Sequence, residues 1–303
     1  MRVLIIGFGS IGRRHAEILR ELGHSVSLQT AQQSDAYPCY DQLAAALTNE
    51  QPDYVVVANE TGRHLASVQE LARLKYSGRL AVEKPLFAMP ATLPALPFAS
   101  MHVAYQLRFH PMMQRLKAAL AGRHAISASL YVGQHLADWR PGRDHRSGYS
   151  ARAGEGGVLR DLSHELDYLL WLFGPWRRVA ALGGNFGACE IAAEETASLL
   201  IEAARCPVCT VQLSYLDRPP RRQLRINCMD GTIDLDLLSG ILSVDGKQET
   251  LAADRNGPIR AMHRSILQDA ATPACTLAEA QDVMQLIAAA ETAMQAQQWV
   301  RAS

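Results

Sequence analysis

The sequence has no net charge, no long apolar run and no cysteine framework, and each absence excludes a class of protein. Its thirty basic and thirty acidic residues cancel, so no overall field draws the chain to nucleic acid or to a membrane surface. No stretch approaches the roughly 20 apolar residues of a membrane span, and no signal peptide is evident at the start. The six cysteines are scattered, as in proteins of a reducing compartment. We therefore expect a cytoplasmic protein without nucleic-acid or membrane partners.

One pair of cysteines, Cys206 and Cys209, is closely spaced. A four-thiolate zinc site would need a second pair, and a thioredoxin-like pair would open a helix. This pair lies between two strand-like runs, so we interpret it as a hairpin turn. The sequence predicts no metal site.

The chain has 303 residues, 48% hydrophobic and 20% charged, which is typical of a folded globular protein. This length exceeds the usual size of a domain with a single hydrophobic core, so two domains are expected. We place a first domain at 1–120 and a second at 121–303.

The chain opens with a strand, a glycine turn and a helix. Residues 3–6 are all β-branched or leucine, as in a strand buried on both faces of a parallel sheet. The glycines that follow have the G-x-G-x-x-G spacing of a dinucleotide-binding turn, which allows a tight turn, approach of a pyrophosphate and close packing of the next helix. A helix over 10–22 would direct its first amides at the anion. The cofactor-binding residues expected here are Gly7, Gly9, Ser10, Ile11 and Gly12.

The second predicted strand, residues 25–30, bears on the choice of cofactor. NAD-preferring sites usually have Asp or Glu near the end of this strand, to bind the ribose hydroxyls. Here Thr30 occupies that position, and no carboxylate follows until Asp35. Hydroxyl and amide groups can accept a 2′-phosphate that a carboxylate would repel. NAD(P) is therefore expected, with NADP slightly favoured over NAD.

Strands and helices continue to alternate through the first domain. This alternation predicts a doubly wound parallel sheet with right-handed connections. Asn59 and Thr61 follow one buried strand and would lie over the cofactor. The expected strands are 53–59, 80–82 and 101–105, and the expected helices are 40–47, 64–74 and 112–121.

The second domain has a different pattern, with several strands joined by short turns. Residues 229–232, Met-Asp-Gly-Thr, are a hairpin signal. We expect an α+β domain whose large, mostly antiparallel sheet carries helices on one face. The expected strands are 126–132, 179–185, 197–203, 210–216, 222–227 and 232–237, and the expected helices are 159–173, 260–270 and 277–298.

Lys84 is the first candidate for chemistry. It lies in Glu83-Lys84-Pro85, at the carboxyl end of a predicted strand, where open α/β sheets bind their ligands. An ammonium group there can donate to a substrate oxygen and stabilise charge that develops on it. The alternative is a surface Glu–Lys pair before a proline turn.

The second candidate is a histidine between two carboxylates. On the predicted helix Asp161, His164 and Asp167 are spaced i, i+3 and i+6, so both acids can approach the imidazole. A histidine oriented by a carboxylate is a good general acid or base near neutral pH. The alternative is a structural histidine within the core.

An arginine- and proline-rich loop, residues 138–146, precedes this helix. Trp139 could stack on a sugar ring, and Arg140 and Arg143 could bind a carboxylate or phosphate. A solvated basic loop is the alternative.

These motifs together resemble one family. The chain is similar, over nearly its whole length, to the glucose–fructose oxidoreductase/inositol dehydrogenase/rhizopine-catabolism (Gfo/Idh/MocA) family of NAD(P)-dependent oxidoreductases. The matching segments are G-F-G-S-I-G-R-R-H at 7–15, N-E-T-G-R-H at 59–64, V-E-K-P-L at 82–86, Y-Q-L-R-F-H-P at 105–111 and G-G-V-L-R-D-L-S-H-E-L-D-Y at 156–168.

The resemblance implies a Rossmann domain followed by an α+β substrate domain, whose open sheet commonly builds homodimers or homotetramers. It also implies that Lys84 and His164 flank the nicotinamide. Many relatives carry Asp-x-x-x-His, whereas Asp161 and His164 are three apart, so either Asp161 or Asp167 could support His164. The matched motifs add His64, Glu83 and Lys84 as cofactor-binding candidates, and Arg108 and His110 as substrate-binding candidates.

The predicted function is hydride transfer between a nicotinamide and a secondary alcohol or ketone of a sugar, polyol or sugar-acid derivative. The loop at 138–143 looks similar to that of relatives associated with surface-sugar and nonulosonic acid biosynthesis, which favours an anionic or nucleotide-linked substrate. Two alternatives stay open: a redox-neutral, NAD-dependent glycosidase or epimerase of the same fold, and a non-catalytic dinucleotide-sensing regulator.

Overall fold

The computed structural model describes residues 1–139, 142, 144–252, 254–268 and 273–302. Within this part of the chain, no helix combines the length and the apolar character needed to cross a membrane. The chain forms two compact units. The first consists of Met1–Phe109 and Arg255–Ala280, and the second of His110–Asp254 and Gln281–Ser303.

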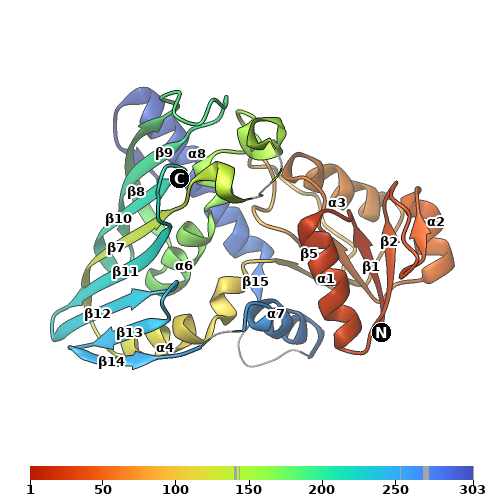
Figure 1. Cartoon of the computed structure of the whole chain (residues 1–303), viewed down its shortest axis with the longest axis horizontal. Coiled ribbons are helices and arrows are strands. Elements are labelled where there is room, and N and C mark those ends of the chain that lie inside the picture. The colour runs from red at the N-terminus through yellow and green to blue at the C-terminus, as the bar shows by residue number, and fades with distance from the viewer. Residues whose placement is uncertain (140–141, 143, 253, 269–272, 303) are drawn as a thin grey trace. The chain divides into compact units, whose positions relative to one another are not determined.

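The first unit is built on a parallel sheet, which confirms the predicted Rossmann-type architecture (Figure 1). In the described residues the strand order is β15-β6-β5-β4-β1-β2-β3, and every neighbouring pair is parallel except β15 with β6. The carboxyl ends of the parallel strands therefore share one edge. The strands are β1 (Arg2–Ile6), β2 (Ser25–Gln29), β3 (Cys39–Tyr40), β4 (Tyr54–Val57), β5 (Arg79–Val82), β6 (Ser100–Val103) and β15 (Cys275–Thr276).

A helix from late in the sequence completes the core of the first unit. Ile259, Met262 and Ile266 of α7 (Gly257–Gln268) pack into the same apolar cluster as side chains of β1, β4 and α1 (Ser10–Glu21). The other helices of this unit are α2 (Leu43–Glu50) and α3 (His64–Arg73). The compact units thus do not follow a single cut at residue 120, because α7 and β15 return to the first sheet. As an assignment of domains, the boundary at 120 stays a prediction.

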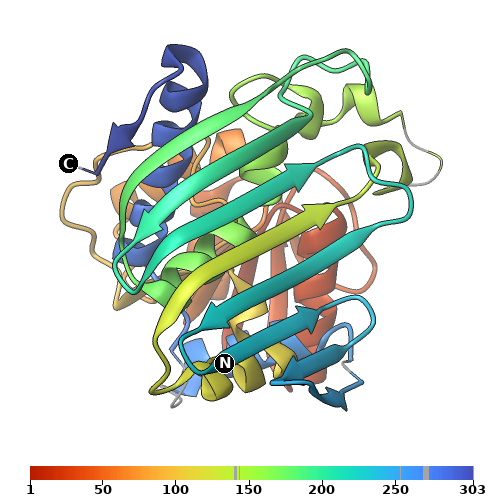
Figure 2. The ribbon, with the colours of Figure 1, turned by 90° about the vertical axis from the view of Figure 1, so that its left-hand side faces the viewer.

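The second unit contains a large sheet that is mostly antiparallel, as predicted (Figure 2). In the described residues its order is β14-β13-β12-β11-β7-β10-β9-β8-β16, and only β7 and β10 run parallel. The strands are β7 (Ala125–Gly133), β8 (Trp176–Gly184), β9 (Thr196–Ala203), β10 (Cys206–Ser214), β11 (Arg221–Cys228), β12 (Gly231–Asp236), β13 (Ile241–Val244), β14 (Lys247–Thr250) and β16 (Val300–Arg301). The hairpin predicted at 229–232 is confirmed, since Cys228 of β11 pairs with Gly231 of β12.

Helices pack against this sheet, among them α4 (Pro111–Leu120) and α6 (His164–Phe173). The other helices of the unit are α5 (Val158–Asp161) and most of α8 (Leu277–Ala296). Two predictions of local structure were wrong. The helix expected at 159–173 is interrupted, because α5 ends at Asp161 and α6 begins at His164. Cys206 and Cys209 lie at the start of β10, beside a bulge, and the hairpin turn comes before them.

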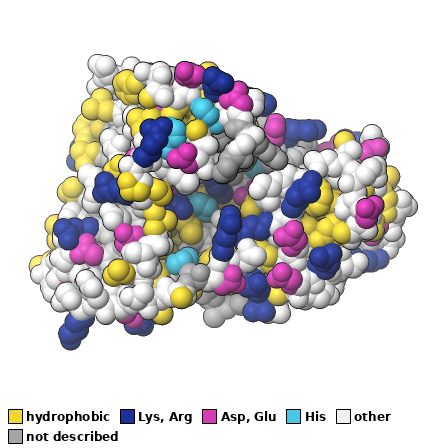
Figure 3. All heavy atoms as spheres, in the orientation of Figure 1, with side chains coloured by type: hydrophobic (Ala, Val, Ile, Leu, Met, Phe, Trp, Pro, Cys, Tyr) yellow, Lys and Arg dark blue, Asp and Glu magenta, His cyan; other side chains and the backbone are white. Residues whose placement is uncertain are grey.

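One face of the molecule shows how the charged side chains are distributed. On the face in Figure 3, basic and acidic side chains lie interspersed, in agreement with the balanced composition.

Candidate active site

The glycine turn after β1 has the geometry that a dinucleotide requires. Gly7 has a φ of +96°, and a Cβ on it would lie 2.7 Å from the backbone of Asn59. A Cβ on Gly12 would strike the carbonyl oxygen of Gly7, so this glycine lets α1 lie against the turn. Around Gly9, by contrast, an added Cβ would have no atom of the described residues within 4 Å, apart from those of the adjoining residues.

Helix α1 begins just after this open space. Its N-cap is Gly9, and no side chain among the described residues caps its first amides. Ser10 is exposed and Ile11 half-buried at this end of the helix. Uncapped amides, a helix dipole and a glycine with open space beside it fit a pyrophosphate group. The residues present therefore fit the pyrophosphate of a dinucleotide.

An arginine lies where the sequence lacks the usual carboxylate. Thr30 is buried, and its hydroxyl oxygen accepts a hydrogen bond from the backbone amide of Gln32 (3.1 Å). The guanidinium of Arg13 donates to the side-chain oxygen of Gln32 at 2.7 Å. The same guanidinium stacks 4.4 Å from the ring centre of Phe8. The end of β2 thus presents a hydroxyl and a cation.

The turns after β4 and β5 are joined through His64. One ring nitrogen of His64 faces the carbonyl of Asn59 (3.1 Å), and the other faces the carbonyl of Pro85 (3.1 Å). The ring is buried, which lowers its pKa. Thr61 is buried in the short helical turn between Asn59 and His64. His64 therefore fixes two turns at the carboxyl edge of the sheet, and its contact with a cofactor stays a prediction.

Lys84 follows β5 at this same edge. Its side chain is half-buried, and its backbone amide donates to the carboxylate of Glu83 at 3.1 Å. The other oxygen of that carboxylate faces Nε2 of His15 at 2.8 Å. Burial alone would raise the pKa of Glu83, but the hydrogen bond with His15 and the charge of Lys84 outweigh it, so the pKa is lowered. Glu83 is thus an ionised, buried carboxylate.

Arg108, a substrate-binding candidate, is buried in the first unit. Its guanidinium donates to the carboxylate of Glu279 at 2.7 Å. This ion pair gives Arg108 a structural role, and its contact with a substrate stays a prediction.

In the second unit, the glycines before α5 make room for a carboxylate. Gly157 has a φ of +88°, and a Cβ on it would collide with the side chain of Glu194. That side chain accepts a hydrogen bond from the amide of Leu159 at 3.1 Å. Glu194 thus caps the start of α5. Burial raises its pKa, although its hydrogen bonds with backbone amides act in the opposite direction.

The candidate residues of α5 and α6 are nearly inaccessible. Asp161, His164 and Asp167 are 5%, 6% and 0% exposed. The hydroxyl of Tyr215 donates to Asp161 at 2.7 Å. The ring of Tyr215 in turn meets that of Trp139 edge to face, with centres 5.3 Å apart. The structure therefore links a predicted catalytic acid to a predicted substrate-binding tryptophan through a tyrosine.

Two ion pairs fix this segment within the second unit. Arg160 is 1% exposed and donates to Glu291 of α8 at 2.5 Å. Glu165 is fully buried and accepts two hydrogen bonds from Arg222, at 2.7 and 2.9 Å. Burial and the charge of Arg222 lower the pKa of His110, whose Nδ1 caps α4. His110 therefore belongs to the same polar cluster as Arg222 and Glu165, and Glu165 directly follows His164.

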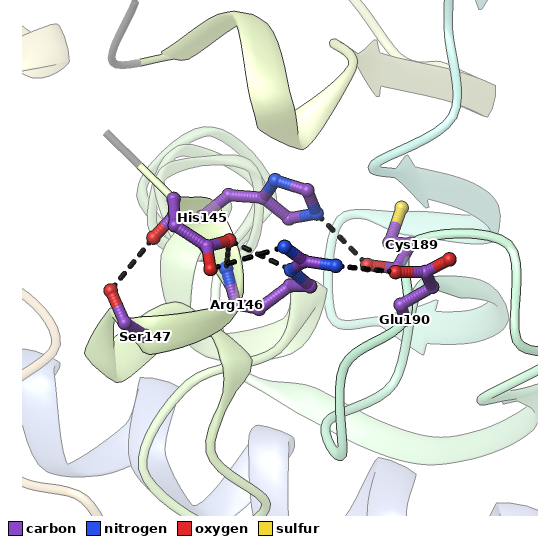
Figure 4. A network of polar contacts seen from close by, with 6 residues as sticks. His145, Arg146, Ser147, Cys189 and Glu190 are labelled. Atoms are coloured by element: carbon purple, nitrogen blue, oxygen red, sulfur yellow. Dashed lines mark hydrogen bonds and ion pairs between the residues drawn. The ribbon is translucent and has the colours of Figure 1, made fainter. Parts of the chain in front are cut away.

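Polar contacts connect the loop before α5, at residues 144–147, with residues 189–190 (Figure 4). Nε2 of His145 lies 2.9 Å from the carbonyl oxygen of Cys189. Arg146 pairs with Asp144 and with Glu190, each at 2.8 Å. Two other candidates of this loop, Arg140 and Arg143, lie outside the described residues.

The candidate residues are divided between the two units. The first contains the glycine turn, Thr30, Asn59 and Lys84, and the second contains Asp161, His164, Asp167, His110 and Trp139. Sequence reasoning missed His15, which contacts Glu83, Tyr215, which contacts Asp161, and Glu194, which caps the helix that ends at Asp161. Only His15 carried a signal, since it lies within the matched motif at 7–15.

Comparison with known families gives two matches in order along the chain. Residues 1–96 match the model for an oxidoreductase family with an NAD-binding Rossmann fold, and residues 113–234 match the model for a GFO/IDH/MocA C-terminal domain. Fold and glycine turn thus define an NAD-binding oxidoreductase. The chain belongs to the Gfo/Idh/MocA family. Comparison with curated proteins finds no match.

Several solved structures share the fold. The WlbA dehydrogenase from Bordetella pertussis, in complex with NADH and UDP-GlcNAcA, is 18% identical, with a TM-score of 0.80 over 100% of this chain and 98% of its own. The UDP-N-acetylglucosamine 3-dehydrogenase GnnA from Acidithiobacillus ferrooxidans is 20% identical, with a TM-score of 0.77 over 98% of each chain. A levoglucosan dehydrogenase in complex with NADH is 14% identical, with a TM-score of 0.82 over 100% of this chain and 99% of its own.

Proposed function

We propose that this protein is an NAD(P)-dependent dehydrogenase or reductase that acts on a secondary alcohol or ketone of a sugar, polyol or sugar-acid derivative. One observation carries the proposal. The glycine turn, Asn59 and Lys84 all lie at the carboxyl ends of neighbouring parallel strands, β1, β4 and β5. An open α/β sheet binds its ligands at this edge. The cofactor cradle and a candidate for charge stabilisation therefore share one edge of one sheet.

The residues that would hold the cofactor are those of the glycine turn, with Thr30 near its ribose and Asn59 and Thr61 near the end of β4. When bound, the nicotinamide supplies the hydride acceptor or donor. Lys84 donates a hydrogen bond to the substrate oxygen and stabilises negative charge there. His164 accepts the hydroxyl proton in the oxidative direction and returns it in the reductive one. Asp161 or Asp167 orients the imidazole.

A sugar-like substrate is supported by residues of the second unit. The Nε1–H of Trp139 is buried and has no hydrogen-bond acceptor within the described part of the chain. A buried donor without an acceptor is costly, and a substrate oxygen could satisfy it. WlbA, which shares the fold, binds UDP-GlcNAcA in its solved structure, and GnnA, which also shares it, is a UDP-N-acetylglucosamine 3-dehydrogenase. A nucleotide-linked or anionic sugar is therefore the first class to test.

The test is a panel of substrates with the purified protein, each assayed by the absorbance of NAD(P)H in both directions. The panel contains UDP-N-acetylglucosamine, UDP-GlcNAcA, levoglucosan and free polyols. Turnover with a sugar that is oxidised or reduced at a secondary carbon supports the proposal. Binding of neither NAD(H) nor NADP(H) would refute it. Turnover without added cofactor, with NAD retained through purification, would indicate redox-neutral chemistry instead.

Thr30 and Arg13, which both contact Gln32, predict the cofactor preference. A Thr30→Asp variant is expected to lose at least about tenfold in affinity for NADPH relative to NADH, because its carboxylate repels the 2′-phosphate. Titration calorimetry with both cofactors measures this ratio. Gln33→Asp, which adds the same charge to an exposed position of the same loop, is the matched control. A wild-type preference for NADH would contradict the predicted role of Thr30.

Assembly into homodimers or homotetramers through the large sheet belongs to the same proposal. Ile126 of β7, Leu200 of β9 and Val208 of β10 are exposed by 42%, 39% and 47%. A shared interface would remove this apolar surface from water. Val208→Glu is then expected to shift the protein to smaller species in analytical ultracentrifugation, and an unchanged distribution would count against this face.

A further inference from the structure

Four buried polar side chains form a continuous chain of contacts in the core of the first unit. Nε2 of His15 lies 2.8 Å from the Glu83 carboxylate, and its Nδ1 lies 2.8 Å from Nε2 of His263. Nδ1 of His263 lies 3.0 Å from the hydroxyl of Tyr54. His15, His263 and Tyr54 are each 0% exposed, and Glu83 is 7% exposed. A set of polar groups this deeply buried is stable only when each finds a partner.

The chain joins distant parts of the sequence. His15 lies on α1, Glu83 follows β5, and His263 comes from α7, which packs beside α1 (Figure 1). The chain of contacts ends at Glu83, the residue before Lys84, and the backbone amide of Lys84 donates to the second oxygen of the Glu83 carboxylate. Three successive contacts therefore connect His263 of α7 with the backbone of Lys84.

The contacts constrain where the ring hydrogens lie. A carboxylate only accepts, so Nε2 of His15 carries a hydrogen, and with no second hydrogen on the ring its Nδ1 is an acceptor. Nε2 of His263 must then donate to it, and Nδ1 of His263 accepts from the Tyr54 hydroxyl. Burial and the neighbouring rings of His15 and His24 lower the pKa of His263 well below its usual value, in agreement with a neutral ring. Every nitrogen of both rings is satisfied, and all donors point towards Glu83.

We infer that His15 and His263 are positioning residues, which hold the carboxylate of Glu83 in one orientation and thereby fix the backbone of Lys84. This inference rests on the proposed function, because it gives the two histidines a role only if Lys84 acts on the substrate. Neither histidine touches a reacting group. Small displacements of a group that binds the reacting atom are costly to turnover, so a fixed Lys84 has a mechanistic value that core packing alone lacks.

The first test compares His263→Leu with His263→Gln in the full-length enzyme. Leucine removes the donor to His15, whereas the amide of glutamine can restore an N–H at the position of Nε2. Hydrogen exchange of the Lys84 amide needs no substrate. We expect about tenfold faster exchange in His263→Leu, as for the loss of one hydrogen bond, and near wild-type exchange in His263→Gln. Met262→Ala, on the same buried helix, is the control for general destabilisation and should leave Lys84 protected.

Kinetics provide the second measurement, with whichever sugar of the panel turns over. His263→Leu is expected to lose roughly 10- to 100-fold in kcat, with the cofactor Kd unchanged and with recovery in His263→Gln. The inference would be overturned if His263→Leu had the same Lys84 amide exchange rate and the same kcat as the wild type. It would also be overturned if Met262→Ala changed both quantities as much as His263→Leu does. If Lys84→Ala keeps full activity, the proposed function fails. Hydrogen exchange of the Lys84 amide in the His263 variants still decides whether the histidines position this residue.

Should His263→Leu fail to fold, nitrogen NMR of the histidine side chains in the wild-type enzyme decides. We expect His263 as the neutral Nε2–H tautomer, and a hydrogen on Nε2 of His15. An Nδ1–H tautomer of either ring would break the direction of the chain and overturn the inference.

Discussion

Replacing Lys84 by Ala is expected to lower kcat by roughly 10²- to 10³-fold, because it removes the donor that stabilises charge on the substrate oxygen. His164→Ala is expected to lower kcat by about 10²- to 10⁴-fold, because it removes the group that moves the hydroxyl proton. The cofactor Kd should stay near wild type in both, since neither change touches the glycine turn. Steady-state kinetics and titration calorimetry separate these effects.

Lys247→Ala and His124→Ala are the controls for these two variants. Both residues are exposed in the second unit: Lys247 begins β14, and His124 directly precedes β7. Their kcat should equal that of the wild type. If Lys84→Ala and His164→Ala both turned over at near-normal rates, the assigned roles would be wrong, and a binding or sensing protein would become the better explanation.

Two alanine substitutions in the glycine turn should separate folding from cofactor binding. Gly9→Ala places its Cβ in open space, on a backbone with φ of −73° that any residue adopts. Its stability should stay within about 0.5 kcal/mol of the wild type. Its affinity for NAD(P)H should nevertheless fall at least about 100-fold, because the methyl group occupies the approach of the pyrophosphate.

Gly12→Ala is expected to have the opposite primary effect: it lowers the stability of the fold rather than obstructing the cofactor directly. Its Cβ would strike the Gly7 carbonyl, so α1 must move, at a cost of about 1–3 kcal/mol or more. Thermal unfolding of both variants, with and without cofactor, makes the comparison. Normal cofactor affinity in a well-folded Gly9→Ala protein would mean that the dinucleotide does not approach at this position.

The sequence predicts best where a feature depends on neighbours along the chain. The strand at β1, its glycine turn and the alternation that follows all have local signals, and each was confirmed. The interruption before His164 was missed because the apolar spacing of residues 159–173 fits one continuous helix. Only the three-dimensional structure shows that α5 ends at Asp161.

Contacts between distant segments had no comparable signal. Tyr215 reaches Asp161 across 54 residues, and Glu194 reaches the amide of Leu159 across 35. In each case the sequence shows an ordinary tyrosine or glutamate near a strand, and only the sheet register decides what it contacts. The strands β13 and β14 were missed for a different reason, since each has only four residues and those of β14 are all polar.

The return of α7 to the first unit has a consequence for synthesis of the protein. Ile259, Met262 and Ile266 fill the core against β1 and α1, yet the ribosome makes them after nearly all of the second unit. The nascent Rossmann domain must therefore wait with part of its apolar core uncovered, in a state that favours aggregation and chaperone binding. A gene fragment that ends at residue 120 would keep the dinucleotide turn and lose the helix that closes its core.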